Sequence, residues 1–130
     1  MKLELVNCDK QYWEFVRQLR TNPENQDGFF SHADITPEQQ SEFMSKHQWD
    51  YQICLADGQP AGYVGLLGGH EITYCVSPDF KGKGIGTWMV EAYSPRWSVV
   101  DAYVKTDNIA SQKVFEKLGW QKQIYYKRNK

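Results

Sequence analysis

The sequence has 130 residues, of which 41% are hydrophobic and 15% are aromatic, so it can bury the core of a single domain over residues 1–130. Its net charge of −1 gives no reason to expect nucleic acid or an anionic membrane as a partner. Residues 1–5 carry no apolar signal stretch, and no segment approaches the length of a membrane span, so we expect no membrane association.

Three cysteines and three histidines are spread over the chain. Because the cysteines are odd in number and far apart, we expect reduced thiols and a cytoplasmic location. The histidines do not have the spacing of metal ligands, so we expect no metal site. These residues are Cys8, Cys54, Cys75, His32, His47 and His70.

The N-terminal third predicts one strand, two helices and a loop between them. Residues 2–6 favour a strand, and Asp9 can cap a helix that ends before Pro23. Residues 22–34 predict a loop. Residues 36–39, Thr-Pro-Glu-Gln, form a capping box with proline at the first helical position, and this box predicts the start of the second helix.

Three strands are predicted in the middle of the chain, at residues 51–56, 61–67 and 71–76, because each segment is rich in β-branched and aromatic residues. The short turns Asp57-Gly58 and Gly68-Gly69 join these strands into an antiparallel meander.

The C-terminal third predicts two helices and two strands. The first helix follows a glycine-rich segment and ends near Tyr93, before Ser94-Pro95. A strand is expected at Val99–Val104, a helix at Ile109–Leu118 and a last strand at Gln121–Lys127.

The glycine-rich segment from Lys81 to Thr87, Lys-Gly-Lys-Gly-Ile-Gly-Thr, connects a predicted strand to a predicted helix. The first turn of a helix has unpaired N–H groups, and its dipole favours negative charge. Glycine lets an oxygen-rich ligand approach where a Cβ atom would block it. With the charges of Lys81 and Lys83, the segment predicts a cradle for pyrophosphate, although a flexible surface turn explains the three glycines by themselves.

Two other glycine-rich motifs do not fit the spacing. A nucleotide P-loop needs Gly-x-x-x-x-Gly-Lys-Ser/Thr, but Gly84 follows Lys83 here, and Ser77 takes the place of the first glycine. A dinucleotide fingerprint needs glycine at position 87, where the chain has Thr87.

A second segment, from Asn108 to Trp120, begins with a suitable N-cap and contains a suitable C′ glycine. Together the two segments resemble the GNAT superfamily of acyl-CoA-dependent N-acetyltransferases. The phosphate loop of that family reads Gln/Arg-x-x-Gly-x-Gly/Ala, and its later helix reads Asn-x-x-Ala/Ser, then an aromatic residue, then Gly-Phe/Trp. The matching residues are Lys81, Gly84, Gly86, Asn108, Ser111, Phe115, Gly119 and Trp120.

The resemblance covers nearly the whole chain and implies a three-layer α+β fold. A mixed central sheet of about six to seven strands would have helices on both faces, in the order β-α-α-β-β-β-α-β-α-β. The resemblance also implies acetyl-CoA as the acetyl donor. The residues that it implies for binding the donor are Tyr74, Cys75, Val76, Lys81, Gly82, Lys83, Gly84, Ile85, Gly86, Thr87, Asn108, Ser111, Phe115 and Lys117.

The resemblance implies direct acetyl transfer without an acyl-enzyme, and a backbone N–H near Tyr74 would face the acetyl oxygen. His70 and Glu71 begin the same predicted strand and point to opposite faces, so we expect one of them to face the acetyl group. The resemblance favours Glu71 as the base, directly or through water, and a solvated strand-end carboxylate stays the alternative. Cys75 is expected to be a packing residue, because His70 lies on the opposite face.

One departure from the family pattern concerns the proton for the leaving thiolate. Many members carry tyrosine where this chain has Phe115, which cannot donate a proton. Tyr74, Tyr125, Tyr126 or water would then serve, or the chain would bind CoA without turnover. Lys81 is a second departure, because it keeps the cation but lacks the guanidinium fork.

The expected acceptor is a primary amine of a small molecule. The stretches 19–24, 35–38 and 114–119 resemble the branch that acetylates nucleotide-activated amino sugars. The branch that acetylates the N-termini of ribosomal proteins has similar motifs and stays an alternative, as does a non-catalytic CoA-binding regulatory module. His32 and Asp34 either contact the acceptor or lie at the surface. The chain would act as a monomer or a homodimer.

Overall fold

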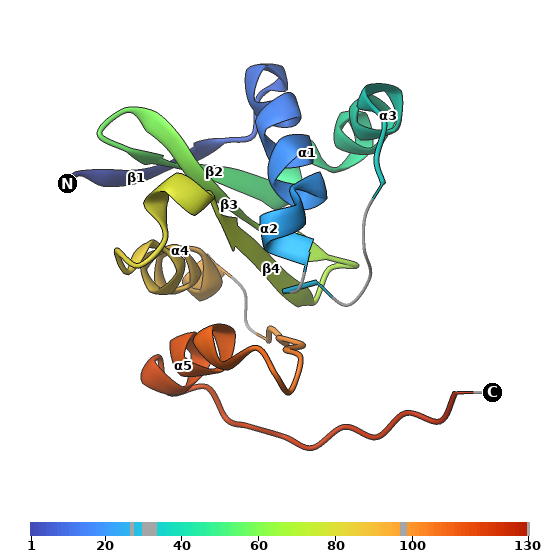
Figure 1. Cartoon of the computed structure of the whole chain (residues 1–130), viewed down its shortest axis with the longest axis vertical. Helices are drawn as coiled ribbons and strands as arrows, with labels where there is room; N and C mark the ends of the chain where they lie inside the picture. The colour runs from blue at the N-terminus through green and yellow to red at the C-terminus, as the bar shows by residue number, and fades with distance from the viewer. Residues whose placement is uncertain (27, 30–33, 97–98, 130) are drawn as a thin grey trace.

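The computed structural model describes residues 1–26, 28–29, 34–96 and 99–129. Four antiparallel strands form one sheet in the order β1-β2-β3-β4, so each strand pairs with the next strand along the chain (Figure 1). The strands are β1 Leu3–Asn7, β2 Tyr51–Ala56, β3 Gln59–Leu67 and β4 Glu71–Val76.

Two tight turns set the register of the meander from β2 to β4. Asp57 and Gly58 have φ angles of 49° and 83°, and Gly68 and Gly69 have φ angles of 58° and 82°. Two successive residues with positive φ make the kind of turn that matches the twist of antiparallel strands. The resulting register places Tyr63 of β3 directly opposite Cys75 of β4.

Helices cover both faces of the sheet (Figure 1). The helices on one face are α1 Trp13–Thr21, α2 Pro23–Gln26 and α3 Pro37–His47, and those on the other are α4 Ile85–Tyr93 and α5 Ile109–Lys117. Single 3-10 turns are present at residues 10–12, 48–50, 78–80 and 94–96. None of the helices in the described ranges is long and apolar enough to cross a membrane.

The sheet separates two apolar clusters, one beneath each layer of helices. The buried members beneath α4 are Cys54, Ala56, Ala61, Val64, Leu66, Ile72, Ile85, Met89, Val90 and Tyr93. The buried members beneath α1 and α3 are Cys8, Val16, Leu19, Met44, Tyr51, Ile53, Tyr63 and Cys75. Because successive side chains of a strand alternate between faces, Tyr74 of β4 faces α4 and α5, whereas Glu71, Thr73 and Cys75 face α1 and α3.

The starts of the first three helices test the capping predictions. The capping box at residues 36–39 is confirmed. The N–H of Thr36 donates to Gln39 Oε1 at 3.0 Å, and the N–H of Gln39 donates to Thr36 Oγ1 at 3.1 Å. The cap at Asp9 is wrong: α1 begins only at Trp13, after a 3-10 turn, and the Asp9 side chain makes no capping bond. The predicted loop contains α2, which begins because Asn22 Oδ1 accepts a hydrogen bond from the N–H of Glu24 at 2.9 Å.

The two predicted C-terminal strands are wrong. Among the described residues, Val99–Val104 makes a single parallel bridge, between Glu71 and Asp101, and Gln121–Lys127 pairs with no strand. The first segment leaves β4 after Asp101, and beside the second segment the described structure has no strand whose N–H and C=O groups could complete a ladder. Over the described ranges the sheet therefore has four antiparallel strands, where about six to seven in a mixed sheet were expected.

Candidate active site

The free edge of β4 opens next to the point where the chain returns beside it. The N–H of Ile72 donates to the Asp101 carbonyl at 2.8 Å, and the N–H of Asp101 donates to the His70 carbonyl at 2.8 Å. Alternate N–H groups of a strand point to the same side, so those of Tyr74 and Val76 point out of this edge too. Neither finds an acceptor within the described part of the chain. The edge thus presents two free backbone donors.

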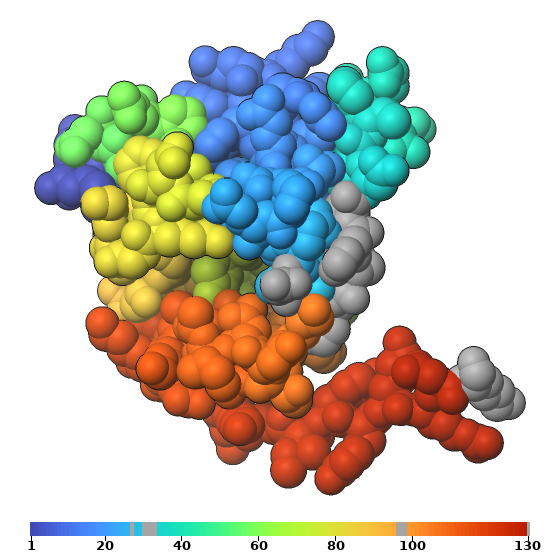
Figure 2. Space-filling view, viewed as in Figure 1, coloured from blue at the N-terminus to red at the C-terminus, as the bar shows by residue number. Residues whose placement is uncertain are grey.

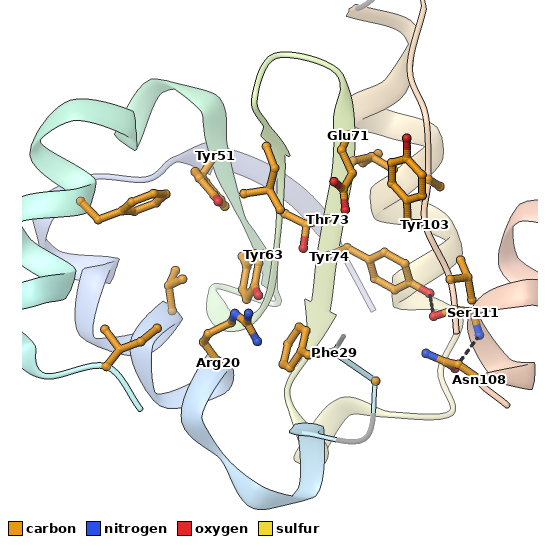
Figure 3. Close-up of a pocket in the computed structure, with 18 of the residues that line it drawn as sticks. Arg20, Phe29, Tyr51, Tyr63, Glu71, Thr73, Tyr74, Tyr103, Asn108 and Ser111 are labelled. Atoms are coloured by element: carbon orange, nitrogen blue, oxygen red, sulfur yellow. Dashed lines mark hydrogen bonds between the residues drawn. The ribbon is translucent and has the colours of Figure 1, made fainter. Parts of the chain in front are cut away.

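A pocket of about 630 Å³ lies at this edge and reaches both faces of the sheet. On one face it is bounded by α1, α3, Tyr51 and Tyr63. On the other face it is bounded by Tyr74 and, around the start of α5, by Asn108 and Ser111 (Figure 3). The surface is visibly hollowed between α2 and α5 (Figure 2). Two molecules that approach from opposite faces can therefore meet beside β4.

The glycine-rich segment 81–87 follows β4 and the 3-10 turn at residues 78–80, and it includes the first residues of α4. Gly82 and Gly84 have φ angles of 78° and 77°, a region that glycine adopts without strain. In the described structure the N–H groups of residues 82–87 donate to no acceptor, and nothing lies within 4 Å of a Cβ built at Gly82 or Gly84. Lys81 and Lys83 are exposed beside these donors. Unpaired donors, open space and positive charge together suit a pyrophosphate group.

Several residues expected to bind the donor do not offer it a side chain. A Cβ atom at Gly86 would lie 3.0 Å from the Tyr74 ring and 3.7 Å from Val76 Cγ2, so this glycine lets α4 pack closely on β4. Ile85 is 1% exposed and belongs to the core beneath α4, which leaves only its backbone for a ligand. Lys117 is exposed at the end of α5.

Tyr74 reaches from β4 to the start of α5 (Figure 3). Its hydroxyl lies 2.8 Å from Ser111 Oγ, and its ring meets the Phe115 ring edge-on, with 6.1 Å between centroids. Asn108 caps α5, since its Oδ1 accepts a hydrogen bond from the N–H of Ser111 at 3.2 Å. Burial raises the pKa of Tyr74 although the bond to Ser111 lowers it, so the phenol is protonated at neutral pH. Tyr74 thus places a proton donor beside Phe115, where the resemblance expects a tyrosine.

Glu71 and His70 begin β4 together but face different surroundings. Glu71 lines the pocket, whereas His70 lies outside its wall, with Nδ1 3.6 Å from Asp101 Oδ2. Burial raises the pKa of Glu71, the charge of His70 opposes this rise, and Asp101 adds to it. A carboxylate with a raised pKa is a stronger base, so Glu71 has both the position and the chemistry to take a proton.

Other candidates from the sequence do not meet in the pocket. Burial raises the pKa of the Cys75 thiol to about 12, and this side chain packs in the cluster beneath α1 and α3. Tyr125 and Tyr126 are 70% and 87% exposed on the C-terminal arm, which extends away from the body (Figure 2). His32 lies outside the described residues, and Asp34 is exposed. Within the described ranges, no group of three or more His, Cys, Asp or Glu side chains could hold a metal ion.

The structure adds pocket residues that the sequence patterns did not single out. Arg20, Tyr51, Tyr63 and Thr73 line the wall on the side of α1 and α3 (Figure 3). A Cβ atom at Gly65 of β3 would lie 2.3 Å from the Tyr51 ring, so this glycine lets the ring lie across the sheet. A glycine inside a strand often marks such a close approach, so Gly65 was a signal in the sequence that could have pointed to this wall of the pocket.

A comparison with family models identifies the class of protein. The model of the acetyltransferase (GNAT) domain matches residues 2–121. The chain therefore belongs to the GNAT family of acetyltransferases. It is an acyltransferase that takes its acetyl group from acetyl-CoA, and the expected α+β fold class is confirmed.

Solved structures of acetyltransferases have a similar fold. The spermidine N-acetyltransferase from Vibrio cholerae in complex with CoA and spermine has a TM-score of 0.78 and 18% identity, over 90% of this chain and 79% of that chain. A GNAT-family acetyltransferase from Bacillus anthracis has a TM-score of 0.76 and 18% identity, over 97% and 84%. An aminoglycoside N-acetyltransferase in complex with CoA has a TM-score of 0.68 and 17% identity, over 98% and 95%. Such identities show the fold alone, and no curated protein sequence matches the chain.

Gly84→Asp should weaken acetyl-CoA binding at least about tenfold, or roughly 1.4 kcal/mol. The new carboxylate would enter the open space at the loop and repel the phosphates. Gly84→Asn is the matched control, because asparagine has the same shape without the charge and also tolerates a positive φ. The measurement is the rise in melting temperature as acetyl-CoA is added. An equal loss in both variants would contradict a role for charge at this loop, and stabilisation by NAD or ATP in place of acetyl-CoA would contradict the site.

Proposed function

We propose that residues 1–130 form one domain that transfers the acetyl group of acetyl-CoA directly to a primary amine of a small molecule. The observation that carries the proposal is the pocket at the free edge of β4, which reaches both faces of the sheet. The donor occupies the side of α4 and α5, where the glycine-rich loop lies. The acceptor occupies the side of α1 and α3, and the two substrates meet beside Glu71 and Tyr74.

The donor side is proposed to act mainly through backbone groups. The N–H groups of residues 82–87, with Lys81 and Lys83, hold the pyrophosphate. The free N–H of Val76 pairs with the pantetheine chain along the edge of β4, and Asn108 lines the same side. Acetyl-CoA supplies the thioester whose carbonyl carbon the amine attacks.

Three groups are proposed to handle the charges and protons of this transfer. The N–H of Tyr74 donates to the acetyl oxygen as negative charge grows there. Glu71 takes the proton that the amine must lose to form the new C–N bond, directly or through a water molecule. As the C–S bond breaks, the Tyr74 hydroxyl gives its proton to the thiolate, and Ser111 Oγ at 2.8 Å supports the phenolate that is left.

A nucleotide-activated amino sugar is our proposed acceptor. The sequence stretches named above support it, and a pocket of about 630 Å³ has the size of a small-molecule site. The related structures contain or are named for polyamine and aminoglycoside acceptors, which are small amines as well. The three cysteines are free and buried, which agrees with a reducing compartment, and we place the protein in the cytoplasm.

Thiol release from acetyl-CoA across a panel of amines tests the proposed function. The panel contains amino sugars and their nucleotide-activated forms, spermidine, an aminoglycoside, and peptides with free N-termini. We expect turnover with at least one small-molecule amine and none with the peptides. Turnover with peptides alone would favour the protein N-terminal reaction. Stabilisation by acetyl-CoA without any thiol release would make the chain a CoA-binding module and contradict catalysis.

A further inference from the structure

The acceptor side of the pocket contains an arginine for which the described residues supply neither a hydrogen-bond acceptor nor an ion-pair partner. Arg20 lies on α1, is partly buried and lines the pocket wall. Its Nη1 is buried with no hydrogen-bond partner, and no carboxylate in the described part of the chain forms an ion pair with it. Burying guanidinium N–H groups without acceptors costs free energy, which a ligand that accepts from them would restore.

Arg17, on the same helix, shows the contrast. Its Nε donates to Glu14 Oε2 at 2.9 Å, and its Nη1 donates to the Ile35 carbonyl at 2.9 Å. The chain therefore pairs one arginine of α1 fully and leaves the other, which lines the pocket, unpaired. Arg20 thus lacks a hydrogen-bond acceptor because of its place in the pocket wall, since α1 itself can supply acceptors to an arginine.

Aromatic side chains hold the Arg20 guanidinium in place. Its Cζ lies 4.0 Å from the centroid of the Phe29 ring, and it points toward Tyr63 and Phe29 (Figure 3). A guanidinium stacked on a ring keeps the donors along its edge in one plane, where a carboxylate or a phosphate can accept two hydrogen bonds at once. Tyr51 and Tyr63 line the same part of the pocket.

The pocket has opposite charges at two separate places. Of the described residues that line it, Arg20 is the one cation and Glu71 is the one carboxylate. Arg20 lies beside Tyr63, which is directly opposite Cys75 in the sheet. Cys75 and Glu71 are four residues apart on β4, which corresponds to about 13 Å of strand. An acceptor amine that lies at Glu71 can therefore reach Arg20 only with a group several bonds away.

We propose that the acceptor is an amine that also carries a carboxylate or a phosphate several bonds from its nitrogen, and that Arg20 binds this anionic group. The inference rests on the proposed acetyl transfer to a small-molecule amine and specifies the class of that amine. Glu71 then faces the amine and Arg20 faces the anion. Spermine, which the related Vibrio cholerae enzyme binds, would place an additional positive charge near Arg20 and should be disfavoured here.

Binding is tested with the full chain saturated with CoA, which has no acetyl group to transfer. Two matched pairs of probes are titrated calorimetrically: glucosamine 6-phosphate with glucosamine, and 6-aminohexanoate with its neutral amide. The wild type should bind the anionic member of at least one pair about tenfold more tightly than the neutral member. A preference in the first pair alone assigns a phosphate, and one in the second pair alone assigns a carboxylate. Spermidine should bind more weakly than either anionic probe.

Three variants separate the role of Arg20 from general effects of charge. Arg20→Gln should abolish the preference, and Arg20→Lys should retain part of it, because lysine keeps the charge without the fork. Lys46→Gln removes an exposed cation from α3 outside the pocket and should keep the full preference. Arg20→Gln removes the stacking of the guanidinium on Phe29 together with a buried N–H group that has no acceptor, so these two effects oppose each other and the melting temperature should change little. In turnover with acetyl-CoA, Arg20→Gln should raise KM for the anionic acceptor and leave kcat nearly unchanged.

Two results would overturn the proposal: equal binding of both members of both pairs, or a preference that survives in Arg20→Gln. The test also distinguishes this proposal from the proposed function. If the preference depends on Arg20 but no amine releases thiol from acetyl-CoA, the acetyl transfer is wrong and the anion site at Arg20 stands.

Discussion

Replacing Glu71 with glutamine should lower the rate of acetyl transfer about 100-fold at about pH 6.5. Glutamine keeps the size of the side chain but cannot take the proton of the amine. The structure places Glu71 in the pocket wall and His70 outside it, so no second base from the start of β4 replaces the lost carboxylate. Thiol release, measured over a range of pH, gives the rate of each variant.

The difference in acetyl-transfer rate between the wild type and Glu71→Gln should shrink as the pH rises. Burial raises the pKa of Glu71, so the wild-type rate rises as the pH passes through this raised value and the carboxylate forms. The rate of the variant depends on amine that has lost its proton unaided, and that fraction grows up to the pKa of the amine. Deprotonation at pH 7 costs roughly 4–5 kcal/mol for an amine of pKa about 10.4 and about 1.4 kcal/mol for one near 8. The deficit should therefore be larger for a lysine-like amine.

Two controls accompany Glu71→Gln. His70→Gln should leave the rate nearly unchanged. A carboxyl whose pKa is higher in the folded state than in the unfolded state loses its stabilising contribution as the pH rises through the folded value, so the ionised Glu71 does not stabilise the fold. Glu71→Gln should therefore melt no lower than the wild type at neutral pH. A wild-type rate for this variant at about pH 6.5 would remove Glu71 from the mechanism and leave His70 or solvent as the base.

Elements with local signals were predictable from the sequence. The capping box at 36–39 and the Asp57-Gly58 turn each depend on residues within a few positions, and both formed as expected. Val99–Val104 and Gln121–Lys127 also have β-forming residues, but a strand needs a neighbour with which to pair. Across the described residues that neighbour is missing after Asp101 and beyond residue 121, and no local pattern contains this information.

The two sides of the pocket also differ in whether a local sequence pattern predicts them. The glycine-rich loop and the cap at Asn108 are continuous motifs, so the elements of the proposed donor side were predictable from the sequence. The acceptor side combines Arg20, Tyr51 and Tyr63 from three elements, and only the strand register together with the packing of α1 on the sheet brings them together. For the proton donor that Phe115 cannot be, the sequence offered several tyrosines or water, and only the structure places the Tyr74 hydroxyl beside Phe115 and Ser111.

Replacing Tyr74 with phenylalanine should lower kcat about 100-fold and leave the affinity for acetyl-CoA nearly unchanged. The variant loses only the hydroxyl, since the ring that packs against Phe115 and Gly86 remains, as does the backbone N–H at the edge of β4. The lost hydrogen bond to Ser111 should cost about 1 kcal/mol of folding free energy, which the melting temperature reports. Tyr103→Phe is the matched control, because it removes a hydroxyl from the same pocket without a bond to α5.

The pH dependence separates the role of Tyr74 from that of Glu71. Burial raises the pKa of Tyr74 above its usual value of 10.0, so the phenol keeps its proton throughout the working range. The deficit of Tyr74→Phe should therefore be constant from about pH 6.5 to about pH 9, where that of Glu71→Gln shrinks. In the proposed mechanism a protonated amine loses two protons: Glu71 takes one and later releases it to solvent, and Tyr74 gives its own proton to the thiolate and regains the second one from the nitrogen, so both residues return to their starting states. A wild-type kcat for Tyr74→Phe would show that water protonates the thiolate and that Tyr74 contributes its backbone N–H alone.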